Sequence, residues 1–490
     1  MVLILLRNKR LEIFKYSVLN TLYHMKIAFH GAAQNVTGSK HLLTLDKGLK
    51  ILLDCGMFQG MGDDTDEMNE EFGFTPSEIN LLILSHAHID HCGLIPRLVA
   101  EGFKGPIYCT APTMALARIL LLDSAKIQEQ DAEYSNRHRK RKGLKPLSPL
   151  YKEEDVIAAL GLFRIVGYKE TFEIDPDVSL FFTDAGHIVG SAAVNLLIKE
   201  DGKETRLTFS GDVGGYQDLL LRPPSIFPQA DYIILESTYG DTLHKDVGST
   251  VGQLLETIHH TCILKGGKVI IPAFSVGRTQ EIIYALNSLD LDGTLPDVPY
   301  YIDSPLSEKA TQVLKDHPDV YNPEVKEVQK VDQDIFGFRN LKFIANVDES
   351  KALNDDPRPC VIISSSGMAE AGRVKHHIKN NIKNPKNTIL MVGYAEPNSL
   401  AGRLIGGKPF VSIFGEEYEV KAEVRSIKSM SAHGDYEDLL KFLSCQDPAE
   451  VKSIFLVHGE LPVQENFKEK ILEKGFKDVQ IPERHQEVEL

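Results

Sequence analysis

A dense group of metal-binding side chains follows a short apolar run at residues 81–84. Imidazoles at His86, His88 and His91 and a carboxylate at Asp90 fall within six positions. In an extended chain or a turn, alternate residues face the same side, so His86 and His88 can converge on one cation. Asp90 and His91 would then face a neighbouring cation. Imidazole and carboxylate are typical zinc ligands, and this spacing predicts a hydrolytic metal site.

Two later turns offer the further ligands that such a site needs, because each ion takes four or more. A strand-like run at 180–183 leads into Asp-Ala-Gly-His187, and another at 207–209 leads into Ser-Gly-Asp212. A lone Gly-His or Gly-Asp pair is more often only part of a turn. Found together with the first group and in this order, His187 and Asp212 become candidate ligands.

The elements that must position these side chains differ along the chain. Up to about residue 240, β-branched and aromatic runs alternate with glycine turns, which predicts a sheet-rich domain with helices such as 113–133 packed on it. From there to 425, units of strand, loop and helix recur, which is typical of a parallel α/β sheet. The clearest units are 268–271 with a helix at 278–289, and 360–363 with a helix at 368–380.

The composition narrows the class of protein. A chain of 490 residues with 42% hydrophobic and 25% charged residues predicts two or three ordinary globular domains. No apolar run is long enough to cross a membrane, and the six cysteines form no C-x-x-C pair, so we expect a cytoplasmic protein without disulfides. The net charge of −15 opposes a polyanion, so any nucleic acid must be attracted locally.

Several motifs carry a resemblance to a known family. The order of Asp54-Cys-Gly56, the histidine group, His187 and Asp212 resembles the metallo-β-lactamase superfamily. Later motifs resemble its β-CASP branch, which processes nucleic acids and includes the cleavage and polyadenylation endonuclease and the bacterial RNase J enzymes. These later motifs are Glu236-Ser-Thr-Tyr-Gly240, Pro272-Ala-Phe-Ser-Val-Gly-Arg278, Ser366-Gly-Met368, Ser431-Ala-His433-Gly-Asp435 and Leu456-Val-His458-Gly459.

The resemblance implies an α/β fold, in which a metallo-β-lactamase αββα sandwich carries an inserted parallel α/β domain, the β-CASP domain. We expect the sandwich to comprise residues 25–240 and 426–490 and the insertion to comprise 241–425. Residues 1–24 precede Met25, which opens a strand-like run. They are expected to be an N-terminal extension or to lie upstream of the natural start.

The resemblance also implies two Zn²⁺ ions per chain, with Mn²⁺ as an alternative metal. One ion would be held by His86, His88 and His187, the other by Asp90, His91 and His458, with Asp212 shared between them. Asp54 would support the loop that carries the ligands. Two such ions activate a water for attack on phosphorus and neutralise phosphoryl charge.

Three further residues receive roles in this scheme. Glu236 and His433 match positions near the leaving group, where His433 would act as general acid and Glu236 would hold its tautomer. Asp90 would both bind metal and orient the attacking water. By itself a histidine in Ser-Ala-His-Gly is usually a turn residue, so the assignment of His433 depends on its motif.

Substrate contacts are predicted at three places. Ser364, Ser365, Ser366 and Gly367 lie in a turn before a predicted helix, where hydroxyls and amides suit either a phosphate or simple helix capping. Arg403, after Gly402, and the neighbouring pair Gly393-Tyr394 are candidates for a backbone phosphate. The basic run 137–142 suits an RNA backbone, although a solvated linker between helices has the same composition.

The expected function is therefore a zinc-dependent ribonuclease that hydrolyses phosphodiester bonds of single-stranded RNA in RNA processing or decay. Two alternatives stay open. The first is another hydrolase of the same fold, acting on a thioester, an ester or a lactam, and the second is a non-catalytic RNA-binding partner. The sequence leaves open endonuclease against 5′-exonuclease action, the 5′-end preference, activity on DNA and the formation of a homodimer.

Overall fold

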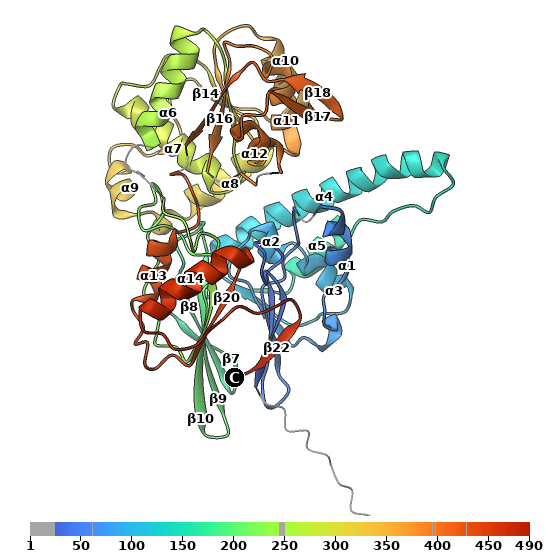
Figure 1. Ribbon diagram of the computed structural model, residues 1–490, viewed down its shortest axis with the longest axis vertical. Helices are drawn as coiled ribbons and strands as arrows, with labels where there is room; N and C mark the ends of the chain where they lie inside the picture. Colours follow the sequence, from blue (N-terminus) through green and yellow to red (C-terminus); the bar gives the residue numbers. More distant parts are fainter. Residues whose placement is uncertain (1–24, 61, 245–249, 394, 397, 428) are drawn as a thin grey trace, which may run out of the picture.

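The computed structural model describes residues 25–60, 62–244, 250–393, 395–396, 398–427 and 429–490. The expected N-terminal extension, residues 1–24, and Tyr394 lie outside the described residues. Two layered sheets with flanking helices form the lower half of the molecule in Figure 1, and a third sheet with its own helices forms the upper half.

The lower half is an αββα sandwich. Its two sheets face each other, and alternate residues of each strand point to opposite faces. In β20, for example, Phe455 and Val457 pack between the sheets, whereas Ile454 and Leu456 pack against the outer helices. The first sheet has the order β22 (Gln486–Glu489), β1 (Lys26–Gly31), β2 (Lys40–Thr44), β3 (Lys50–Leu53), β4 (Leu81–Ile83), β5 (Ile107–Cys109), β6 (Phe163–Ile165). The second has the order β21 (Val479–Gln480), β20 (Ser453–Val457), β11 (Tyr232–Glu236), β10 (Lys203–Phe209), β9 (Ala192–Glu200), β8 (Val178–Asp184), β7 (Thr171–Asp175).

Helices cover the outer faces of both sheets. The first sheet is covered by α2 (Ile89–Cys92), α3 (Ile95–Ala100), α4 (Ala111–Arg141) and α5 (Glu153–Leu160). The second is covered by α13 (Tyr436–Leu443) and α14 (Leu461–Glu473), whose apolar side chains Leu439, Phe442, Phe467 and Ile471 are buried. A short helix, α1 (Thr65–Glu70), lies in the connection from β3 to β4.

The upper half is built on a parallel sheet. Its order is β14 (Leu341–Phe343), β13 (Tyr300–Ile302), β15 (Val361–Ser364), β12 (Val269–Pro272), β16 (Thr388–Val392), β19 (Glu423–Ile427). Helix α6 (Thr250–Ile258) precedes its first strand in the chain, β12. The helices between its strands are α7 (Arg278–Leu291), α8 (Pro305–Asp316), α9 (Pro323–Val328), α10 (Val347–Asp355), α11 (Gly372–Asn381) and α12 (Leu400–Ile405), and a small hairpin joins β17 (Phe410–Ile413) to β18 (Glu416–Glu419). This pattern confirms the predicted α/β fold, in which a parallel α/β unit is inserted into the sandwich.

The chain leaves the sandwich after β11 and, on its return, forms α13 and then β20. The two strands pair in parallel, with Glu236 opposite Val457. Segments separated by more than 200 residues therefore end side by side at the same edge of the second sheet. None of the helices in the described ranges is long and apolar enough to cross a membrane.

Two predicted helices differ from the structure. The helix predicted at 368–380 begins only at Gly372, because Ala369 and Gly372 adopt positive φ angles of 57° and 76° that interrupt helical geometry. The helix predicted at 113–133 continues to Arg141, since the residues from 126 onward are mostly good helix formers and the next glycine is Gly143. The basic run 137–142 therefore lies at the end of α4 and not in a linker.

Candidate metal centre

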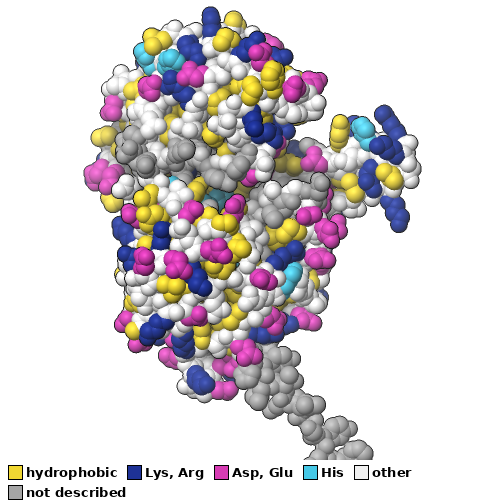
Figure 2. All heavy atoms as spheres, viewed as in Figure 1, with side chains coloured by type: hydrophobic (Ala, Val, Ile, Leu, Met, Phe, Trp, Pro, Cys, Tyr) yellow, Lys and Arg dark blue, Asp and Glu magenta, His cyan; other side chains and the backbone are white. Residues whose placement is uncertain are grey.

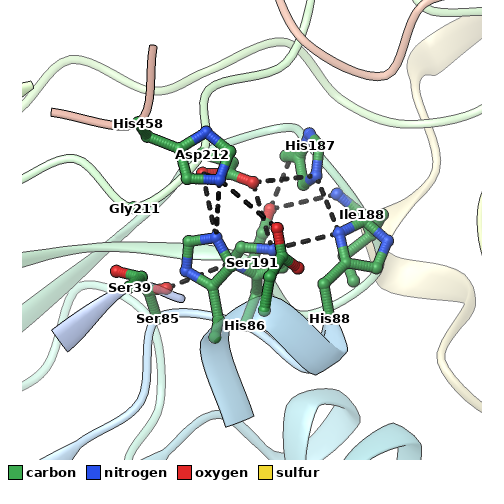
Figure 3. Close-up of polar contacts among 12 residues, drawn as sticks. Ser39, Ser85, His86, His88, His187, Ile188, Ser191, Gly211, Asp212 and His458 are labelled. Atoms are coloured by element: carbon green, nitrogen blue, oxygen red, sulfur yellow. Dashed lines mark hydrogen bonds and ion pairs between the residues drawn. The ribbon is translucent and has the colours of Figure 1, made fainter. Parts of the chain in front are cut away.

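The histidines and carboxylates predicted from the sequence meet at one edge of the sandwich, where several strands end. His86 and His88 follow β4, and Asp90 and His91 lie on α2 directly after them. The remaining candidate ligands come from other turns: His187 from the turn between β8 and β9, Asp212 from the turn after β10, and His458 from the turn after β20. Figure 3 shows most of these side chains directed toward one another.

The first group contains His86, His88, His187 and Asp212. Nδ1 of His88 lies 3.1 Å from Nε2 of His86 and 3.1 Å from Nε2 of His187. Oδ2 of Asp212 lies 3.4 Å from Nε2 of His86 and 3.5 Å from Nε2 of His187. Four donor atoms thus surround one point, as a tetrahedral zinc site requires.

The second group contains Asp90, His91 and His458. Nε2 of His458 lies 3.3 Å from Nε2 of His91 and 3.4 Å from Oδ2 of Asp90. The other carboxylate oxygen of Asp212, Oδ1, lies 3.2 Å from Nε2 of His91 and 3.7 Å from Nε2 of His458. Asp212 therefore presents one oxygen to each group.

The protonation of the first group suits a cation. Burial lowers the pKa of His86 to about 3 and that of His88 to about 4, and it also lowers the pKa of His187 well below its usual value. These imidazoles are neutral at neutral pH, so their lone pairs are available to a metal without a competing proton.

The outer nitrogens of four histidines are held by neighbours. Nδ1 of His91 lies 2.6 Å from Asp54, and Nδ1 of His86 lies 3.1 Å from the hydroxyl of Ser85. Nδ1 of His187 lies 3.0 Å from the carbonyl oxygen of Ala432, and Nδ1 of His458 lies 3.0 Å from the hydroxyl of Thr238. In each pair the neighbour can accept the Nδ1 proton, which leaves the Nε2 lone pair facing the site.

Sequence reasoning did not assign these roles to Ser85, Ala432 and Thr238, although all three lie in motifs that carry candidate site residues. Their position within one or two residues of His86, His433 and Glu236 was the available signal. Ser85 donates its hydroxyl proton to Asp54 and Thr238 donates its own to the carbonyl oxygen of His458, so each can accept from imidazole. Ser191 was also missed; its hydroxyl accepts the amide of His187 at 3.0 Å and supports that turn.

A further observation indicates that these side chains can hold divalent cations. Oδ1 of Asp212 is buried and has no hydrogen-bond partner in the described part of the chain. A buried carboxylate oxygen without a partner is costly, and a cation between Asp212, His91 and His458 would satisfy it. The residues present can thus hold metal at both groups.

Asp54 lies beneath the ligands and is fully buried. It accepts the amide of Ser85 at 2.7 Å, in addition to its contact with His91. Its φ of 58° is rare for a residue other than glycine, and His458 has a φ of 52°. Such backbone strain is concentrated at functional sites, where the surrounding structure enforces it.

Gly56 allows the loop after Asp54 to lie against α2. A Cβ atom at this position would be 1.6 Å from the carbonyl oxygen of Asp90. We expect Gly56→Ala to displace the loop bearing Asp90 and His91, to lower the free energy of unfolding by about 2 kcal/mol or more, and to reduce bound metal. Thermal denaturation and metal analysis measure both effects.

Gly252→Ala is the matched control for this prediction. Gly252 lies in α6, and a Cβ atom there would have nothing within 4 Å. Alanine is a better helix former than glycine, so this variant should be as stable as the parent or more stable. Equal stability and equal metal content in the two variants would contradict the role given to Gly56.

His433 lies beside the metal groups on the loop between β19 and α13. Its Nδ1 is 3.0 and 3.1 Å from the two carboxylate oxygens of Glu236, and its Nε2 is 4.0 Å from Asp212. Glu236 is fully buried and also accepts the amide of Val213 at 2.6 Å. Burial lowers the pKa of His433, but the charges of Glu236 and Asp212 outweigh it and raise the pKa to about 9.

The residues predicted to contact phosphate lie less close together than the candidate metal ligands. The hydroxyl of Ser364 is buried and donates to the carbonyl oxygen of Asp303, so it faces into the protein. The hydroxyl of Ser365 lies 3.0 Å from that of Ser304, which caps the start of α8. Ser366 and Gly367 follow in the loop before α11, and Arg403 is paired with Glu370 at 3.3 Å.

The site and fold define a metal-dependent hydrolase, and family models name its parts. Residues 42–204 match the metallo-beta-lactamase superfamily domain, 279–404 match the Beta-Casp domain, and 417–482 match the Zn-dependent metallo-hydrolase RNA specificity domain. The chain belongs to the β-CASP branch of the metallo-β-lactamase superfamily, as the sequence motifs predicted.

Curated relatives extend over most of the chain. A ribonuclease of Thermus thermophilus, TTHA0252, is 36% identical over 89% of this chain and 93% of its own length. An RNase J-like protein of Methanocaldococcus jannaschii is 35% identical over 89% of this chain and 92% of its own length. Transcription termination factor FttA of Methanosarcina mazei is 29% identical over 89% of this chain and 67% of its own length.

A solved structure shares the fold. The crystal structure of a protein of unknown function from Enterococcus faecalis V583 covers 96% of this chain and 100% of its own, with a TM-score of 0.52 and 12% sequence identity. At that identity the likeness concerns the fold alone.

Proposed function

We propose that this protein is a zinc-dependent ribonuclease that hydrolyses phosphodiester bonds of single-stranded RNA. The observation that carries the proposal is the arrangement of two donor groups that share Asp212, with the His433 and Glu236 pair beside them. The names of the curated relatives support RNA as the substrate, since one is a ribonuclease and another is RNase J-like.

The proposed ligands follow from the distances between donor atoms. His86, His88 and His187 would hold one zinc ion, Asp90, His91 and His458 the other, and Asp212 both. Mn²⁺ is the alternative metal, because nitrogen and oxygen donors accept both ions. Two bound cations would activate water near neutral pH and neutralise charge on the phosphoryl oxygens.

The protein's own groups would complete the reaction. His433, protonated at neutral pH, would donate its Nε2 proton to the departing ribose oxygen, while Glu236 holds the ring through Nδ1. Asp90 would orient the attacking water with the oxygen that does not face His458. Asp54 would fix the direction of His91.

The inserted unit would position the RNA. We propose domain bounds of 25–240 with 426–490 for the sandwich and 241–425 for the insertion, with the RNA lying between the two. Ser365 and Ser366 are retained as phosphate contacts, together with Ser304 at the start of α8, where helix amides favour an anion. Ser364 is left out because its hydroxyl is buried and donates to the backbone of Asp303, and Arg403 would first have to leave Glu370.

The proposal is tested with zinc-loaded protein and 5′-labelled single-stranded RNAs that carry a triphosphate, a monophosphate or a hydroxyl. Zinc-dependent shortening of the RNA is expected, and the product lengths distinguish internal cleavage from trimming at the 5′ end. A thioester substrate is assayed in parallel. Hydrolysis of the thioester with intact RNA would identify a different hydrolase of the same fold, and RNA binding without cleavage by zinc-loaded protein would identify a non-catalytic partner.

A further inference from the structure

Residues 126–150 form an arm that extends from the body of the molecule (Figure 1). The last buried residue of α4 is Ala125, and the next buried residue in the chain is Tyr151. The returning segment is tied to the helix by polar contacts, since Asn136 exchanges two hydrogen bonds with the backbone of Leu147 at 2.9 and 2.7 Å. These contacts hold the returning segment against the helix, although no side chain of the arm is fully buried and only Leu150, at its end, packs partly against the core.

The end of the arm is strongly basic in an otherwise acidic chain. Residues 134–152 contain no Asp or Glu and seven cations, namely Arg137, Arg139, Lys140, Arg141, Lys142, Lys145 and Lys152. Only the first and the last of these form an ion pair among the residues that the structure describes, with Glu133 and Glu154. Figure 2 shows Lys and Arg side chains gathered at this end of the arm. The other five cations, at 139–142 and 145, form no ion pair in the described part of the chain and can meet an anionic partner.

Stabilisation of the helix end accounts for only part of this charge. Arg139, Lys140 and Arg141 lie in the last turn of α4, where cations interact favourably with the helix dipole, whereas Arg137, Lys142 and Lys145 lie outside it. Five of the six positions from 137 to 142 carry a cation, and at 100° per residue their side chains point in all directions around the axis. Such a distribution surrounds the tip with positive charge, which suits a flexible polyanion.

The base of the arm lies beside the candidate metal centre. The hydroxyls of Thr110 and Thr113, at the start of α4, donate to the carbonyl oxygen of Gly190 at 2.7 and 2.8 Å, in the turn that carries His187. At 1.5 Å per residue, Arg139 lies about 39 Å along the helix from Thr113. In Figure 1, α4 leaves the molecule where the upper and lower halves meet, so an RNA that emerges between them could follow it.

The arm also carries an aromatic side chain that suits a nucleic acid. Tyr134 is 66% exposed and lies one turn before Arg137 and His138. Exposed aromatic rings beside cations bind single strands by stacking with bases while the cations bind phosphates. A second copy of this chain would be held mainly by apolar contacts, and the arm offers only scattered ones, such as Ile127 and Leu144.

We propose that this arm binds the sugar-phosphate backbone of RNA outside the catalytic centre, about 40 Å from it along α4. The choice of RNA rests on the proposed function. The arm therefore acts on long substrates only: about five stacked nucleotides, at about 3.4 Å each, do not reach from the metal centre to the cationic tip.

The test compares two variants with the same change in charge. The arm variant carries Arg137→Gln, Arg139→Gln, Lys140→Gln, Arg141→Gln and Lys142→Gln; the control carries Lys199→Gln, Lys330→Gln, Lys351→Gln, Lys421→Gln and Lys452→Gln, all on exposed side chains. Each set is built into zinc-loaded protein with His433→Ala to prevent turnover. Fluorescence anisotropy then gives the Kd for RNAs of about 5 and about 40 nucleotides over a range of salt concentrations.

For the long RNA, the arm variant is expected to bind about tenfold or more weakly, and the slope of log Kd against log salt to fall by up to about 3.5, since each phosphate contact contributes about 0.7. The control and the short RNA should change little. Equal Kd values and slopes for the two variants would overturn the proposal. Loss of a dimer in light scattering, with unchanged RNA affinity, would also overturn it and make the arm a contact between copies.

The RNA-binding role of the arm and the proposed ribonuclease function can fail independently. A parent protein that binds the long RNA through the arm but cleaves no RNA would refute the ribonuclease and leave the arm's role intact. For the cleavage assay the five arm substitutions are built into protein that keeps His433. If the parent protein cleaves both RNAs and this variant cleaves the long one at an unchanged kcat/KM, the arm is refuted and the ribonuclease stays intact.

Discussion

Asp212→Asn is expected to lower bound zinc at both groups and to reduce RNA cleavage by about 10³-fold or more. Asp212 is the residue that faces both groups, with Oδ2 toward His86 and His187 and Oδ1 toward His91. Asparagine keeps the shape of the side chain but removes the charge and one acceptor. Metal analysis by mass spectrometry and an RNA cleavage assay measure the two effects.

The matched control is Asp231→Asn. Asp231 is also buried at an end of a strand of the second sheet, but at the start of β11, where it accepts the amide of Arg206 at 2.8 Å. This variant should keep its zinc and its activity even if it loses some stability. If Asp212→Asn binds as much zinc as the parent, the shared carboxylate is not a ligand, and the two donor groups would have to act independently.

The local part of the candidate site could be predicted from the sequence because its candidate ligands are close together in the chain. His86, His88, Asp90 and His91 fall within six residues, so strand and turn geometry alone brings them together. His187 and Asp212 were recognisable because each ends a strand-like run. The meeting of Glu236 with His433 could not be derived from periodicity, since Glu236 ends β11 and His433 lies on the loop that follows the inserted unit. Only the family motifs indicated it.

The parts that sequence reasoning missed depend on contacts between distant segments. The carbonyl oxygen of Ala432 reaches His187, which is 245 positions away, and a backbone carbonyl carries no signal in the sequence. The hydroxyl of Ser364 was expected to face a phosphate, but it is engaged by Asp303 of the neighbouring strand end. The length of α4 was underestimated because apolar periodicity ends where the helix leaves the core, while helix-forming residues continue.

These contacts also link the two halves of the molecule at the site. The loop between β19 and α13 supplies both the carbonyl oxygen of Ala432 and the imidazole of His433, and it connects the last strand of the parallel sheet to the sandwich. A movement of the inserted unit would therefore be transmitted to His187 and His433 together. The roles proposed for His187 and His433 would therefore both depend on the position of the unit proposed to bind RNA.

His433→Ala is expected to keep about two zinc ions per chain and to lower cleavage of ordinary RNA by about 10² to 10⁴-fold, the usual contribution of a general acid. The proton it would supply is needed only by a poor leaving group. An RNA with sulfur in place of the departing ribose oxygen needs no such proton, so the variant should cleave this RNA at nearly the parental rate. Glu236→Gln, which keeps the hydrogen bond but removes the charge, should show a smaller loss with the same dependence on the leaving group.

The control for His433→Ala is His260→Ala, because His260 forms a similar pair with a carboxylate, Glu423, at 3.1 Å outside the site. This variant should cleave both RNAs normally. Zinc content decides between the two roles open to His433, since its Nε2 is 4.0 Å from Asp212 and its position would also suit a ligand. Loss of one zinc ion in His433→Ala would make His433 a ligand. An equal loss of activity on the oxygen and sulfur substrates would make it a positioning residue. In either case another group would have to protonate the departing oxygen.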